Sequence, residues 1–192
     1  MNKNSEITEK SLKLAADSGD INAQYNLGSL YYDQDKVDLA EYYWKLAADN
    51  GHSDAQYDLG LFYKEQEIFY TEEKLNLAVK YLKLVADAGN ADAQYDLGNL
   101  YREIGNLDMA ARYLKFAGSK GKIQAYYNLG FMYKKENKIE AVEYYWKLAA
   151  DNGDKLAQWR LSTLYHEQGK EELSNKYFDL YFDKIEDVFI QW

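Results

Sequence analysis

The sequence predicts an all-α fold: an α/α solenoid of about five helix hairpins with a capping helix at each end. The main observation is a six-residue phrase, Ala-Gln-Tyr-Asp-Leu-Gly at Ala93, which recurs with small changes at Ala23, Ala55, Ala125 and Ala157. The copies lie 32, 38, 32 and 32 residues apart. A second series, of glycines, keeps the same spacing, and the apolar residues between them follow the helical period. Repeats of this size at a nearly fixed spacing are typical of solenoids.

The expected repeat boundaries come from the glycine series. Residues 6–20 are predicted to form an N-terminal capping helix that ends at Gly19, because glycine readily adopts the left-handed conformation in which many helices stop. The later stops are Gly51, Gly89, Gly121 and Gly153. We therefore expect a single repeat domain over 1–192, with full repeats at 21–52, 53–90, 91–122 and 123–154 and a degenerate repeat and cap at 155–192.

Each full repeat is predicted to contain two helices, called helix A and helix B. In the first repeat helix A covers about residues 22–34 and helix B about 37–50, with Trp44 expected on the buried side of helix B. Gly28 lies inside helix A, where glycine costs about 1 kcal/mol relative to alanine, so its recurrence implies a neighbouring helix too close for a Cβ atom. The equivalent residues are Gly60, Gly98 and Gly130. Expected helix N-caps are Asp20, Asn90 and Asp154, and expected turn residues are Asp35, Gly105, Asn137 and Gly169.

The second and last repeats depart from this pattern. The second is six residues longer, with the excess near 67–72; these residues either lengthen the helices, with Ile68 and Phe69 packed locally, or protrude as an apolar contact at a groove edge. The last has Ser162 in place of the packing glycine and ends in the apolar segment 185–192. That tail either covers the end of the stack or docks a second copy, so we expect a monomer or a weak homodimer.

The chain is acidic, with a net charge of −9 and a pI near 4.8. This charge argues against binding to a nucleic-acid backbone or an anionic membrane, and it leaves a basic partner open. Cysteine is absent, which excludes disulfides and thiolate metal sites. The polar start and the lack of a long apolar stretch predict a cytoplasmic chain without a signal peptide or membrane span.

Motifs for chemistry are also missing from the sequence. There is no phosphate-binding loop, nucleophile elbow or zinc-protease motif, and the two histidines leave little basis for metal binding. His166, in helix A of the last repeat, is expected to be a half-exposed surface residue or a groove contact. We therefore expect no enzymatic activity, no cofactor and no metal.

The repeats carry a family resemblance. The run Ala-Gln-Tyr-Asp-Leu-Gly-x-x-Tyr, followed by Ala-x-x-Tyr-Tyr-x-Lys-Leu-Ala-Ala-Asp-x-Gly, resembles Sel-one-like repeats (SLR), close relatives of tetratricopeptide repeats (TPR). The resemblance covers about residues 10–182, although no proline ends a unit and the turn between helices is short. It implies a right-handed solenoid that binds proteins or peptides. Some Sel-one-like proteins have also been assigned hydrolytic activities, which adds an enzyme as a third class of function.

On each helix A, a second periodic set of side chains is left over from packing. The resemblance implies that this set faces a concave groove. Equivalent positions of this set form a tyrosine ladder of Tyr25, Tyr57, Tyr95 and Tyr127, which continues into Trp159. The predicted protein-binding residues are Asn22, Tyr25, Tyr32, Asp33, Asp54, Tyr57, Lys64, Asp92, Tyr95, Asn99, Arg102, Tyr127, Phe131, Lys134 and Trp159. Other members of the same outward set are Ser29, Leu61, Glu65, Glu103, Gln124, Lys135, Thr163, His166 and Glu167.

Two interpretations of the tyrosine ladder remain open: the rings pack between repeats, or rings and hydroxyls recognise a ligand. Acidic residues dominate the set in the early repeats and basic residues in the late ones, so a ligand is expected to place its basic end toward the N-terminal repeats. The predicted function is a non-catalytic scaffold or adaptor that binds a peptide or protein segment in a tyrosine-lined groove. The alternative is an acidic inhibitor or immunity-type protein that blocks a basic protein surface.

Overall fold

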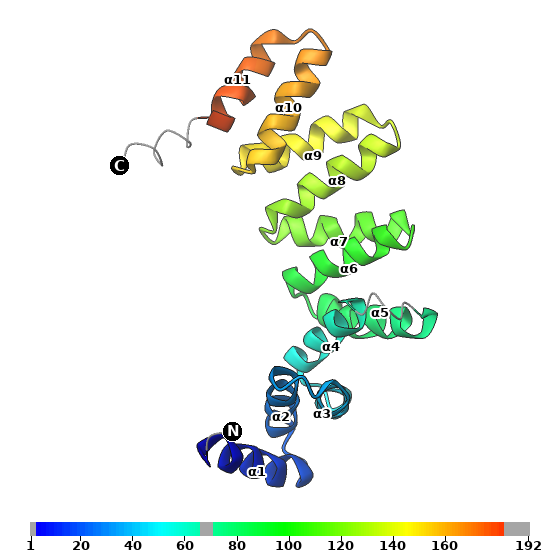
Figure 1. The fold of residues 1–192 in the computed structure, drawn as a ribbon. Coiled ribbons are helices and arrows are strands. Elements are labelled where there is room, and N and C mark those ends of the chain that lie inside the picture. The colour runs from blue at the N-terminus through cyan, green and yellow to red at the C-terminus, as the bar shows by residue number, and fades with distance from the viewer. Residues whose placement is uncertain (1–2, 66–70, 183–192) are drawn as a thin grey trace, which may run out of the picture. The chain divides into compact units, whose positions relative to one another are not determined.

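The computed structural model describes residues 3–65 and 71–182 and shows helices joined by short turns in both ranges (Figure 1). The predicted contacts at Ile68 and Phe69 and the tail at 185–192 lie outside the described residues. The helices are α1 (Lys3–Asp17), α2 (Ile21–Asp33), α3 (Val37–Asp49), α4 (Ser53–Glu65), α5 (Glu72–Asp87), α6 (Ala91–Glu103), α7 (Leu107–Ser119), α8 (Ile123–Lys135), α9 (Ile139–Asp151), α10 (Lys155–Glu167) and α11 (Glu171–Phe182).

The chain divides into two compact units, Met1–Leu100 and Tyr101–Trp192, and each is described by itself. In the N-terminal unit α2 packs against α3 and α4 against α5 as hairpins, while α1 contacts α2 and α3 contacts α4. The C-terminal unit repeats this arrangement, with hairpins α8–α9 and α10–α11 and with α7 against α8 and α9 against α10. The predicted all-α helical-repeat solenoid fold is thereby confirmed.

Caps and turns lie where the sequence places them. The side chains of Asp20, Asn90 and Asp154 each accept a hydrogen bond, of 2.9, 2.9 and 2.8 Å, from the backbone N–H three residues on. Helix α4 has an unpredicted cap, because the N–H of Ala55 donates to His52 Nδ1 at 3.2 Å. The expected turn and stop residues adopt positive φ, among them Asp35 and Asn137 at 57°.

The described part of the six-residue insertion in the second repeat lies in α5, which is longer than the equivalent helix α3. Helix α5 has 16 residues, against 13 in α3, and begins after the N-cap Thr71, whose hydroxyl accepts from the N–H of Lys74 at 3.3 Å. The extra turn of helix agrees with the expectation that the insertion lengthens helix B of this repeat.

The two helices of a hairpin approach each other most closely at the helix A glycine. A Cβ atom built on Gly28 would lie 2.5 Å from Trp44 Cδ1, and one on Gly60 would lie 2.7 Å from Leu82 Cγ. In the C-terminal unit a Cβ on Gly130 would overlap the ring of Trp146 in the same way. These distances are shorter than a carbon–carbon contact allows, so the predicted close approach is confirmed at these three positions.

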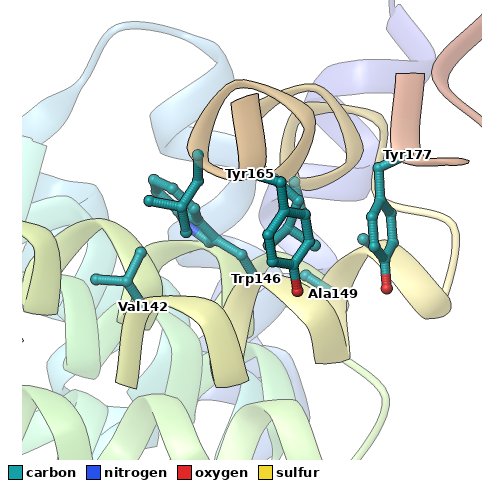
Figure 2. Packing of buried hydrophobic residues seen from close by; sticks show 9 residues of the cluster. Val142, Trp146, Ala149, Tyr165 and Tyr177 are labelled. Atoms are coloured by element: carbon teal, nitrogen blue, oxygen red, sulfur yellow. The ribbon is translucent and has the colours of Figure 1, made fainter. Parts of the chain in front are cut away.

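Tyrosine–carboxylate hydrogen bonds connect successive repeats inside each unit. In the C-terminal unit the buried rings of Tyr165 and Tyr177 stack 5.8 Å apart, with both hydroxyls on the same side (Figure 2). Tyr165 donates to Glu143 at 2.9 Å and Tyr177 to Asp151 at 3.0 Å, both on α9. Because a buried hydroxyl without a partner is costly, these bonds fix the rotation of one hairpin against the next.

Three buried tyrosines of the N-terminal unit form the same kind of hydrogen bond. The hydroxyl of Tyr31 donates to Glu9 at 3.2 Å, that of Tyr63 to Glu41 at 2.7 Å, and that of Tyr81 to Asp49 at 3.0 Å. Burial, reinforced by the neighbouring carboxylate, raises the pKa of Tyr31, Tyr81 and Tyr177 to about 12. The protonated phenol is therefore part of each contact between repeats.

Replacing Gly28 by alanine tests the close approach. The new methyl group would overlap the Trp44 ring, and the gain in helix propensity would offset only part of the resulting strain. We expect Gly28→Ala to lower the free energy of unfolding by about 1–2 kcal/mol in urea titrations. Asn26→Ala, on the exposed side of the same helix, should change it by less than about 0.5 kcal/mol. A Gly28→Ala chain as stable as the parent would contradict the packing.

Alkaline pH should weaken the contacts between repeats. The folded pKa of about 12 exceeds the unfolded value of about 10, so the folded chain holds more protons than the unfolded chain above pH 10. The stabilisation is complete below about pH 10 and is lost as pH rises through about 12. Urea unfolding across this window should show a steadily falling free energy, with a smaller slope in Tyr177→Phe. A pH-independent free energy would refute this account.

Candidate functional site

The predicted tyrosine ladder of the N-terminal unit is tied to the neighbouring repeat. Tyr25 and Tyr57 are half-buried, and their hydroxyls donate to Asp58 at 2.9 Å and to Asp96 at 2.6 Å. The ring of Tyr25 also stacks on His52, with centroids 4.5 Å apart. Burial and the bond to Asp58 raise the pKa of Tyr25 to about 12, and burial likewise raises the pKa of Tyr57. For these two hydroxyls the geometry favours packing over ligand recognition.

The two aspartates that accept these bonds differ in their other neighbours. Lys64 Nζ lies 3.7 Å from the second oxygen of Asp96, whereas no ion pair of the described residues involves Asp58. The residue equivalent to Lys64 in the preceding repeat is Tyr32. Burial raises the pKa of the Asp58 carboxyl, an effect that the hydrogen bond from Tyr25 partly opposes. Asp58 is therefore a partly desolvated carboxylate that makes no ion pair within the described chain, although the nearby His52 also favours its charged form.

A pocket of about 320 Å³ opens beside Asp58, between the first and second repeats. Three rings meet in it: Tyr32 lies 5.1 Å from Trp44 and 6.4 Å from Phe62, and Trp44 lies 6.0 Å from Phe62, between ring centroids. The indole N–H of Trp44 donates to Ser29 Oγ at 3.1 Å, which fixes the ring. We call this the aromatic–acidic pocket; its lining residues are Ser29, Tyr32, Asp33, Trp44, Asp58, Leu61, Phe62 and Glu65.

The sequence predicted the outward side chains of this pocket but not its buried ones. The expected outward set contains five of its lining residues: Ser29, Tyr32, Asp33, Leu61 and Glu65. Trp44, Asp58 and Phe62 were not predicted as site residues, since a tryptophan in helix B was expected to be buried. Trp44 is indeed 5% exposed, but it lines the pocket floor. One repeat later, the places of Tyr32, Trp44 and Phe62 are taken by Lys64, Leu82 and Leu100. This difference between repeats is the signal that could have indicated the site.

The corresponding surface of the C-terminal unit is aromatic and basic. Tyr127 is half-buried and stacks on Trp146 with centroids 6.4 Å apart. Lys134 Nζ lies 5.6 Å from the centroid of the Trp146 ring, and the guanidinium of Arg160 lies 4.6 Å from that of Trp159, which is 42% exposed. Phe131 is covered in the same manner by Lys135, at 5.4 Å. The change of charge sign between the units agrees with the sequence.

The remaining predicted residues differ in exposure. Asn22, Asp54 and Asp92 are exposed, whereas Tyr95 and Arg102 are half-buried.

Asn99 departs from the expectation, because it is only 7% exposed and offers little surface to a ligand. His166 is exposed, with Nδ1 3.2 Å from Glu171.

Neither a cluster of metal-ligating side chains nor a membrane-spanning helix occurs among the described residues. Within residues 3–65 and 71–182, no group of three or more His, Cys, Asp or Glu side chains could hold a metal ion. Of the helices described, none combines the length and the apolar character that a membrane span requires.

Comparison with solved structures supports the repeat fold. An antigen of uropathogenic Escherichia coli that displays an SLR fold superimposes with a TM-score of 0.64, at 24% identity over 83% of this chain. This chain spans 36% of that protein's length. YrrB, a TPR protein with an unusual peptide-binding site, gives a TM-score of 0.64 at 17% identity and covers 91% of this chain and 92% of its own.

A third structure is an immunity protein, Pa5087 of Pseudomonas aeruginosa. It superimposes with a TM-score of 0.51 at 19% identity, covering 95% of this chain and 83% of its own. No protein-family model matches the sequence, and no curated protein matches it. The structural likenesses show that this chain has the fold of Sel-one-like and tetratricopeptide repeat proteins.

Proposed function

We propose that this chain is a non-catalytic interaction module, a scaffold or adaptor that binds a protein or peptide segment through the outward side chains of its A helices. The observation that carries the proposal is the aromatic–acidic pocket, which collects outward side chains of α2 and α4 around an indole held by a hydrogen bond. Buried aromatic anchors surrounded by polar residues are typical of surfaces that bind proteins.

Preorganisation supports a binding role. The walls of the pocket belong to helices that the Tyr25–Asp58 and Tyr63–Glu41 hydrogen bonds hold in register. A surface that is ordered before binding loses little conformational entropy when a partner arrives, so more of the contact energy remains as affinity. The TPR-type relatives in fold, one of which is described as having a peptide-binding site, suggest the same kind of role.

Charge indicates the kind of segment that would bind the N-terminal unit. The predicted residues Asp33, Asp54 and Asp92 are exposed there, and Asp58 and Glu65 line the pocket. Complementary charge accelerates encounter and disfavours partners of like charge. We therefore propose a partner with a basic segment that contacts this unit.

A second candidate is an immunity-type protein that blocks a basic protein surface. The net charge of −9 and the likeness in fold to the immunity protein Pa5087 favour it. Such a protein would bind mainly through a broad acidic patch, so its complex would weaken steeply as salt screens the charges. A surface with aromatic anchors would lose less of its affinity in salt, because burial of apolar surface is not screened.

Charge reversal on the A helices should separate binding from folding. Partners captured from extract of the native cell with the wild-type chain should be lost, or bound at least about tenfold more weakly, by Asp54→Lys/Asp92→Lys. Each aspartate is exposed in the first turn of its helix, α4 or α6. Calorimetry with the captured partner measures the loss, and a salt series discriminates between the two candidates.

The matched control is Asp38→Lys/Glu73→Lys. These acids are also exposed in the first turns of their helices, α3 and α5, so the change in net charge and the cost against the helix dipole are the same. The control should bind as wild type does. Equal weakening by both pairs would contradict binding through the A helices and support a general effect of charge.

A further inference from the structure

The aromatic–acidic pocket combines negative charge with aromatic faces and holds no cation of its own. Asp33, Asp58 and Glu65 contribute carboxylates, and no ion pair of the described residues involves any of them. No cationic side chain is among the lining residues. The ring of Tyr32, which is 45% exposed, lies 5.1 Å from that of Trp44, and both rings line the pocket. An electronegative cavity with aromatic walls attracts cations and disfavours anions.

The next repeat of the same unit has a lysine at the position where the aromatic–acidic pocket has Tyr32. Asp96 occupies the place of Asp58 and accepts the same bond from a ladder tyrosine, yet it has Lys64 at 3.7 Å. That lysine comes from the position of Tyr32, one repeat earlier. Leu82 and Leu100 replace the rings of Trp44 and Phe62 there. In this second setting the chain provides its own cation and no aromatic walls.

The C-terminal unit offers the complementary comparison. Trp146 is equivalent to Trp44, and the lysine equivalent to Tyr32, Lys134, lies with its Nζ 5.6 Å from the centroid of the Trp146 ring. Each of the two lysines at this position thus contacts a group beside it: Lys64 contacts the Asp96 carboxylate of the following repeat, and Lys134 contacts the Trp146 indole of its own repeat. Among these three repeats, only the first combines an indole of its own with a carboxylate from the following repeat, and it has a tyrosine in place of the lysine.

We propose that the aromatic–acidic pocket binds the cationic side chain of an arginine in the basic segment of a partner protein. The inference deepens the proposed function and rests on it. The volume of about 320 Å³ admits one long side chain, and the entering guanidinium takes the place that a lysine of the chain itself occupies in the second and fourth repeats. It can stack on the Tyr32 or Trp44 ring while its N–H groups reach the free oxygen of Asp58.

Arginine fits better than lysine for a geometric reason. A guanidinium is planar, so it can pair with a carboxylate along one edge and stack on a ring with its face. It is also more weakly hydrated than an ammonium group, so transfer into a pocket with three rings costs it less. An apolar side chain would instead desolvate Asp58 further without compensating its charge.

The test uses a blocked amino acid as the probe and does not need the natural partner. N-acetyl-arginine methylamide is titrated into the full chain, and the indole N–H resonance of Trp44, assigned with Trp44→Phe, reports binding by NMR. We expect saturable binding in the millimolar range. The isosteric neutral probe, N-acetyl-citrulline methylamide, should bind at least about tenfold more weakly, and the lysine analogue should fall between the two.

Two variants locate the binding. Tyr32→Lys installs the cation that the chain has at Lys64 and Lys134, and Asp58→Asn removes the charge while leaving an oxygen for the Tyr25 hydroxyl; each should weaken arginine binding at least about tenfold. The matched control is Tyr42→Lys, the same substitution at a tyrosine of α3 that is 56% exposed and does not line the pocket. It should leave the affinity unchanged, and circular dichroism verifies that each variant folds.

The outcomes separate this inference from the proposed function. Equal binding of the arginine and citrulline probes, or equal weakening by Tyr32→Lys and Tyr42→Lys, would overturn the arginine pocket and leave the proposed interaction module intact. Arginine binding that is lost in Tyr32→Lys, while partner capture fails to respond to Asp54→Lys/Asp92→Lys, would support the pocket and refute the wider surface. A lysine probe that binds more tightly than arginine would overturn the choice of cation.

Discussion

The close approach of two helices at the helix A glycine is the constraint on which the rest of this structure depends. A glycine at position 28, 60 or 130 lets the side chain of Trp44, Leu82 or Trp146 lie against bare backbone. Helix B then buries its large residues in the hairpin, and the remaining face of helix A is left outward. The same contact therefore determines the core and decides which side chains are available to a partner.

Hydrogen bonds between tyrosines and carboxylates add the second constraint, the alignment of one hairpin with the next. Each bond contributes only about 1 kcal/mol net, but a buried hydroxyl left without a partner would cost more, so the bonds select one register over its neighbours. They also use up groups that would otherwise be available for recognition. The hydroxyls of Tyr25 and Tyr57 belong to this framework.

The sequence predicted the fold in detail because the repeats supply several independent copies of each local signal. Caps such as Asp20, positive-φ turns such as Asp35 and the packing glycines depend on short-range geometry, which a repeat period reveals. The depth of a side chain is a different matter, because it depends on the sizes of residues on the adjacent hairpin. Helical periodicity placed Asn99 on the outward face without showing that it is buried, and placed Trp44 in the core without showing that its ring reaches a pocket.

Differences between repeats, rather than the repeated frame, determine what each part of the surface can bind. The position that holds Tyr32 in the first repeat holds Lys64 in the second and Lys134 in the fourth, and in the two later cases the lysine contacts the chain's own carboxylate or indole. Such an internal contact satisfies the charge locally and removes it from the available surface. With a tyrosine at the same position, a carboxylate and an indole line the pocket without a lysine among its lining residues. The repeated frame tolerates these exchanges, because the packing glycines and the tyrosine hydrogen bonds are present in the first and second repeats alike.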